Sequence, residues 1–124
     1  MAGEYINDEI FDGGLDYADT NGARIDITSQ VATTRTEAVT TYTLGNDTVN
    51  TGAPEAGDVD GRKVVVPAIT AGSVTGNGTA THWALTSGTE LLATGPLTSS
   101  QAVTSGNTFS LDAIDITIRD ATVT

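Results

Sequence analysis

The sequence contains no cysteine, only five lysine and arginine residues, and a single histidine. Without cysteine the chain can form no disulfide, thiolate nucleophile or zinc–sulfur site. The single histidine, His82, is the one side chain on which a Ser-His-Asp triad or a histidine acid–base scheme could depend, and its place inside a predicted strand is more typical of a packed residue. One histidine without cysteine also argues against a transition-metal site. We therefore expect no metal and no cofactor.

Positive charge is scarce, because five basic residues stand against 16 acidic ones and the net charge is −11. Proteins that bind nucleic acid use a basic surface to release phosphate counterions, and these few scattered cations cannot provide one. The same net charge disfavours anionic membrane surfaces. We expect neither nucleic acid nor a membrane as a partner.

Long apolar runs are also missing, and no segment approaches the roughly 18 apolar residues that a membrane-spanning helix needs. The opening residues 1–9 lack the basic start and the apolar run of a signal peptide. We expect a product that is made in a cytoplasm and stays soluble there.

Aromatic residues are few: one Trp, three Tyr and two Phe. A glycosidase needs a carboxylate pair and aromatic platforms in a deep cleft, and this composition supplies little of either. Residues 58–61 resemble the start of a calcium loop, but the third acidic ligand and the closing glutamate are missing. We interpret them as an acidic turn, and weak calcium binding with help from Asp47 or Glu55 is the alternative. We expect no catalytic residues and no enzyme activity.

What the sequence does contain is a series of short strand patterns separated by turn signals. Residues 79–86 and 90–94 predict a hairpin about Ser87-Gly88, and Gly95-Pro96 predicts a chain break after it. Residues 101–104 and 108–111 predict a further hairpin. Alternating apolar and polar residues over 114–118 predict a half-buried strand.

The first part of the chain is less regular. Asn21-Gly22 predicts a hairpin within residues 15–29, although its simplest register would put the apolar residues on opposite faces. Residues 36–44 contain many threonines, which favour a strand, but the order Thr36, Glu37, Ala38 and then Leu44-Gly45 favours one short helix.

Together these patterns predict an all-β fold, an antiparallel β-sandwich or small barrel with a possible short helix near 36–44. We expect a single domain over residues 15–124, preceded by residues 1–14 as an N-terminal arm or an edge strand. Trp83 could be a sugar-stacking platform if exposed, but its setting on a strand is more typical of a core anchor. The predicted core anchors are Trp83, Leu85, Ile114, Ile116 and Ile118.

Two segments are candidates for contact with a partner or with other copies of the chain. One is the apolar and acidic N-terminal segment, and the other is the region rich in Gly, Asn and Asp over residues 45–61. The contact candidates are Tyr5, Ile6, Ile10, Phe11, Asp47, Val49, Pro54 and Val59.

Two longer stretches, residues 22–45 with Gly22-Ala23-Arg24-Ile25-Asp26-Ile27 and residues 78–109 with Thr81-His82-Trp83-Ala84-Leu85, resemble small virion proteins of tailed bacteriophages. The resemblance implies a structural protein, most plausibly a capsid decoration (cement) protein on the outer surface of the virion. Such a protein clamps neighbouring subunits of the major capsid protein, and self-association as a trimer or dimer is expected. The resemblance supplies no catalytic or contact residues.

Two other functions remain open at this point. The same kind of β domain could serve in a phage tail, neck or fibre, because one fold supports many roles. A glycan-binding module for host attachment is the third possibility, and it requires an exposed aromatic ring.

Overall fold

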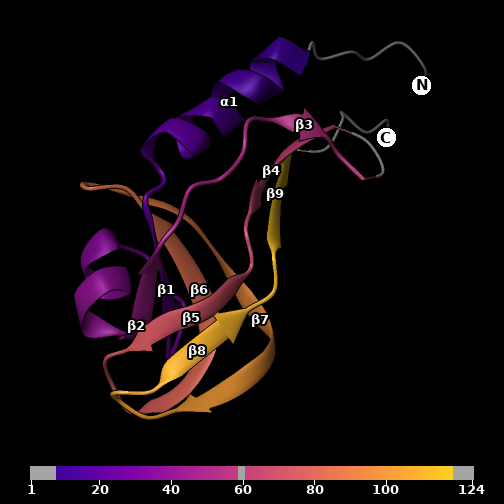
Figure 1. The fold of residues 1–124 in the computed structure, drawn as a ribbon. Helices are drawn as coiled ribbons and strands as arrows, with labels where there is room; N and C mark the ends of the chain where they lie inside the picture. The colour runs from indigo at the N-terminus through magenta and orange to yellow at the C-terminus, as the bar shows by residue number, and fades with distance from the viewer. Residues whose placement is uncertain (1–7, 59–60, 119–124) are drawn as a thin grey trace, which may run out of the picture.

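The structure is a computed structural model that describes residues 8–58 and 61–118, with side chains described from residue 13 onward. Strands dominate it (Figure 1), so the predicted all-β fold with a short helix is confirmed. In chain order the elements are α1 (Asp8–Asn21), β1 (Arg24–Thr28), the helical turn η1 (Glu37–Thr41), β2 (Thr43–Thr48), β3 (Glu55–Ala56), β4 (Arg62–Val66), β5 (Ile69–Val74), β6 (Gly78–Thr86), β7 (Leu91–Val103), β8 (Thr108–Leu111) and β9 (Ile114–Ile118).

The larger sheet has six strands in the order β7-β6-β1-β2-β5-β8, and all neighbours are antiparallel. It curls into a half-barrel (Figure 1), so its first and last strands face each other across an opening. The smaller sheet has three strands in the order β3-β4-β9.

The two sheets are joined by one bent ribbon. Val66 pairs with Ile114 in the smaller sheet and Ile69 pairs with Leu111 in the larger one, so the register stays the same across the junction. Pro67 lies between these pairs and has no N–H to donate, which interrupts the ladder where the ribbon bends. Pro67 directly follows Val66, the last residue of β4. Beyond the bend, β4 packs against α1.

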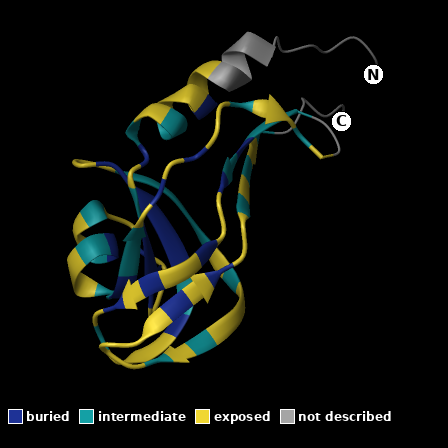
Figure 2. Cartoon of the chain, in the orientation of Figure 1, coloured by how far each residue is buried: buried dark blue, intermediate teal, exposed yellow. Residues whose placement is uncertain are grey.

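Strand β1 is buried on both faces. Ile25 and Ile27 point into the half-barrel, where they join the main apolar cluster. Asp26 and Thr28, on the opposite face, are also fully buried because η1 covers that side, with Ala38 in a second small cluster. Figure 2 shows the buried segments concentrated along the centre of the sheet.

The N-terminal part of the described chain is helical, which corrects two predictions. Residues 8–14 belong to α1 rather than to an edge strand, while residues 1–7 lie outside the described residues. The hairpin about Asn21-Gly22 is also wrong, because α1 continues to Asn21 and the Gly22 N–H donates to the Ala18 carbonyl at 2.7 Å. Leu15, which is 2% exposed, anchors this helix. Among the described residues, no helix is long and apolar enough to cross a membrane.

The short helix near 36–44 is present as the π-helical turn η1, and the Tyr42 N–H donates to the Glu37 carbonyl at 2.8 Å. It ends earlier than predicted, because Leu44 and Gly45 already belong to β2. A Cβ built on Gly45 would lie 2.6 Å from the Ser73 carbonyl oxygen, so this glycine serves a close strand approach rather than a helix end.

Two predictions for the second half are also wrong. Strand β7 continues through Gly95-Pro96, since proline is tolerated on an edge strand. Strands β7 and β8 do not form a hairpin, because β7 pairs with β6 and β8 pairs with β5. The predicted hairpin of residues 79–86 with 90–94 is confirmed as β6 and β7, and residues 114–118 form β9 with alternating exposure.

Candidate functional site

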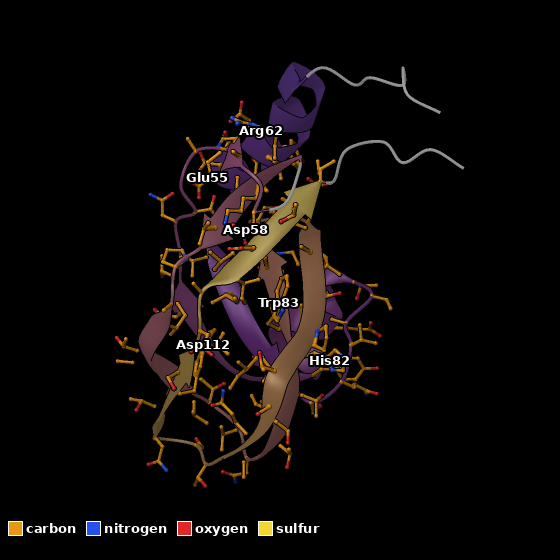
Figure 3. The ribbon with its side chains drawn as sticks, turned by 90° about the vertical axis from the view of Figure 1, so that its right-hand side faces the viewer. Glu55, Asp58, Arg62, His82, Trp83 and Asp112 are labelled. Carbon is orange, nitrogen blue, oxygen red and sulfur yellow. The ribbon has the colours of Figure 1, made fainter. Side chains whose placement is uncertain are left out.

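The opening of the half-barrel is the most distinctive surface of the molecule. It lies between two open strand edges. One edge is β7, and the other is β8 of the larger sheet followed by β9 of the smaller sheet. The side-chain Nε2 of Gln101 donates to the backbone carbonyl of Ser110 at 2.8 Å, so a hydrogen bond spans the opening at one point. We call this opening the seam. Figure 3 is turned toward this side and places Trp83 between Asp112 and His82.

A wide bulge in β7 holds the seam open. Ala80 pairs with Gln101 and His82 pairs with Pro96, so residues 97–100 of β7 lie opposite Thr81 alone. A bulge of this kind bends its strand and ends regular pairing. The displaced segment has no partner on β6, and β7 and β8 remain the two unpaired ends of the larger sheet.

A cavity of about 280 Å³ lies in the seam between this bulge and the bend that joins β8 to β9. We call it the seam cleft. Its floor is apolar and its rim is polar, with one ionisable side chain, that of Asp112. Its lining includes Trp83, Leu97, Leu111, Asp112, Ala113 and Ile114.

Trp83 forms part of the floor and is 9% exposed. The backbone of Gly95 packs against its ring, since a Cβ built on Gly95 would lie 2.8 Å from Cε2, Cζ2 and Nε1. A sugar-stacking platform needs an open aromatic face. The burial of this ring favours the core role and leaves little face for a sugar.

The indole N–H of Trp83 is not hydrogen-bonded within the described part of the chain. Thr86 Oγ1 is the one buried side-chain polar atom of these residues without a hydrogen-bond partner, so Nε1 of Trp83 keeps some exposure to solvent.

A buried ionic network braces the opposite face of β1. Arg24 Nε donates to Asp26 Oδ1 at 2.8 Å and Arg24 Nη2 donates to Oδ2 at 2.9 Å, a bidentate pair. Thr43 Oγ1 donates to the same carboxylate at 2.6 Å. The hydrogen bond with Asp26 raises the pKa of Arg24. These bonds satisfy Asp26, so we assign this network to structure rather than to catalysis.

A second ionic group lies on the smaller sheet. Lys63 Nζ donates to Asp58 Oδ1 at 2.6 Å and to Asp115 Oδ2 at 3.1 Å. The hydrogen bond to Asp58 is the main cause that raises the pKa of Lys63, and the same bond lowers the pKa of Asp58. Asp58 thus serves in an ion pair, and within the described part of the chain no group of three or more His, Asp or Glu side chains is placed to hold a metal ion.

The predicted contact residues are spread over several elements. Asp47 is half-buried on β2, where its carboxylate accepts from the Thr48 N–H at 2.8 Å. Val49 is 8% exposed and Pro54 is half-buried, so the chain after β2 is partly packed. Ile10 and Phe11 lie in α1 with side chains that are not described, and Tyr5, Ile6 and Val59 lie outside the described residues.

The predicted core anchors fall into two groups. Trp83 and Leu85 are buried in the main cluster. Ile114 and Ile116 are half-buried and pack against it, and Ile118 is half-buried with its Cδ1 3.6 Å from a Cβ built on Gly14. His82 is half-buried, and its Nδ1 lies 2.8 Å from Thr81 Oγ1.

Sequence reasoning missed the seam residues Leu97, Gln101 and Asp112. Their signal was the run of small polar residues after Gly95-Pro96, which we interpreted as a break between strands. No local pattern indicates that this run faces the β8–β9 bend, because that contact depends on the curl of the whole sheet.

No family model, curated protein or solved structure matches this chain.

Proposed function

We propose that this chain is a structural component of a tailed-bacteriophage particle, a capsid decoration protein that binds and stabilises the assembled shell of major capsid protein. The observation that carries the proposal is the number of open strand edges. Among the described elements, β7 and β8 end the larger sheet and β3 and β9 end the smaller one. Open edges expose backbone groups that can pair with another chain, and proteins that do not use them normally protect them.

The composition supports the same role. A net charge of −11 keeps a protein soluble at high local concentration, which a high-copy shell component requires. The resemblance to small virion proteins gives the particle and the location, the outer capsid surface.

The mechanism of stabilisation is mechanical. Each copy buries apolar surface and forms hydrogen bonds across a junction between shell subunits. Apolar burial contributes about 25 cal/mol per Å², and the loss of freedom on association offsets much of this gain. Repetition over the shell multiplies a modest contact energy. Self-association as a trimer or dimer would place several open edges around one symmetry axis of the shell.

Cosedimentation tests the proposal. The purified chain is mixed with assembled empty shells and, separately, with unassembled major capsid protein. We expect saturable binding to shells and little binding to free subunits. Binding to isolated tails but not to shells would instead favour the tail, neck or fibre role.

A further inference from the structure

The two rims of the seam cleft carry backbone groups that take no part in the sheet ladders. Residues 97–100 lie out of register with β6, and residues 112–113 lie opposite Pro67 and Ala68, where no strand pairing occurs. Residues 98–100 and 112–113 are exposed, so solvent can reach these groups. A bound chain could replace this solvent with backbone hydrogen bonds.

The size of the cleft favours side chains over a whole small molecule. Small-molecule sites usually have volumes of about 300–1,000 Å³. The cavity here has about 280 Å³ and is open at a strand edge. Its apolar floor of Leu97, Leu111 and Ile114 suits an aliphatic side chain.

The charges around the seam cleft indicate the sign of the charge on its occupant. Asp112 is exposed and is the one ionisable side chain in the lining. The chain as a whole carries a net charge of −11, so a basic segment complements Asp112 in this cleft better than an acidic segment of a second copy would.

We propose that the seam cleft binds an extended, basic segment of a partner polypeptide. The segment lies between the two rims as an added strand, one aliphatic side chain fills the cleft over Trp83, and a neighbouring Lys or Arg pairs with Asp112. This proposal goes beyond the virion role, because it depends on the seam alone. Its test does not depend on the particle to which the chain belongs.

The chain carries a single tryptophan, so its fluorescence reports directly on the cleft. The probe is a library of hexapeptides with blocked termini and no aromatic residues. The two central positions are varied, and the peptides are grouped into a basic, a neutral and an acidic pool. We expect a saturable change in Trp83 fluorescence with the basic pool, at an affinity about fivefold tighter than with the acidic pool, as suits an exposed ion pair.

Three variants make the test specific. Asp112→Lys should reverse the preference between the pools, and the matched control Asp16→Lys, at an exposed position of α1, should leave it unchanged. Ala113→Phe should fill the cleft and remove binding of every pool while circular dichroism shows an unchanged thermal transition. Because Ala113 is exposed, this variant should not disturb the core.

Three results would overturn the proposal. One is that no pool changes the fluorescence at millimolar concentration. Another is that the acidic and basic pools bind equally. The third is a dimer by analytical ultracentrifugation that Ala113→Phe dissociates, since this would make a second copy the occupant of the seam.

Discussion

Gly95 lies against the ring of Trp83 so closely that a Cβ at Gly95 would stand 2.8 Å from three ring atoms. This contact couples the edge strand β7 to the core of the half-barrel. It also fixes the indole at the floor of the seam cleft, so the geometry of the cleft depends on a residue without a side chain.

Gly95→Ala should therefore destabilise the protein. The added methyl group must displace the ring or the strand, and overpacking of this kind costs about 1–3 kcal/mol. The measurement is the free energy of unfolding from urea denaturation. Gly88→Ala is the matched control, because a Cβ there meets nothing within 4 Å, and we expect it to change stability by less than about 0.5 kcal/mol. Equal effects of the two variants would contradict this packing.

Asp26→Asn should destabilise the protein through the buried network on the outer face of β1. Asp26 is fully buried, and the substitution removes the charge that pairs with Arg24. Loss of a partner for a hydrogen-bonded charged group costs about 1–3 kcal/mol. Asp16→Asn, at an exposed position on α1, is the control and should have little effect on the urea midpoint. A midpoint for Asp26→Asn equal to that of the parent would show that the network contributes nothing.

Tyr17 should titrate above its ordinary pKa of 10.0. Its hydroxyl donates to Glu90 Oε1, and this bond, together with the charge of Glu90, raises the pKa. Because the folded pKa is raised, the stabilisation from this pair is complete below pH 10 and is lost as the pH rises through the folded pKa of Tyr17.

Near-ultraviolet absorbance of tyrosinate during an alkaline titration measures this shift. Tyr17→Phe identifies the part of the absorbance change that belongs to Tyr17. Glu90→Gln should lower the pKa of Tyr17 toward 10.0. Glu55→Gln, on the exposed strand β3, removes the same charge elsewhere and should leave the titration unchanged. If Glu90→Gln does not move the titration, α1 does not make this contact in solution.

Deletion of residues 1–7 should lower shell binding more than it lowers folding stability. The deletion removes two of the predicted contact residues, Tyr5 and Ile6, and leaves every described element in place. Cosedimentation with shells measures the first effect, and the urea midpoint measures the second. Equal losses in both would mean that the segment is part of the folded core.

The sequence predicted the elements whose pattern is local. Alternation over residues 114–118 and the turn at Ser87-Gly88 correspond to β9 and to the β6–β7 hairpin. These signals hold because a period of two and a tight turn each depend on neighbouring residues alone.

Helix α1 was missed because its local signals point elsewhere. Gly13-Gly14 lowers helix propensity, and Asn21-Gly22 is a common hairpin turn. The helix depends on distant contacts instead, including Thr51 Oγ1 donating to Asp19 Oδ1 at 3.0 Å. A sequence signal did exist, since the spacing of Phe11, Leu15 and Ala18 is helical.

The seam could not be predicted from local patterns. It combines a bulge at residues 97–100 of β7 with a bend opposite Pro67 that follows β8, and the two meet because the six-stranded sheet that ends in β7 and β8 curls. Each part has a sequence signal of its own, but their meeting is a property of the sheet as a whole.

The most direct test of the central claim is a cryo-electron microscopy map of the particle that carries this protein, with copies per particle counted by quantitative mass spectrometry. We expect hundreds of copies as regular density on the outer shell, with open strand edges against the major capsid protein. A few copies along the tail axis, or none in the particle, would contradict the decoration role.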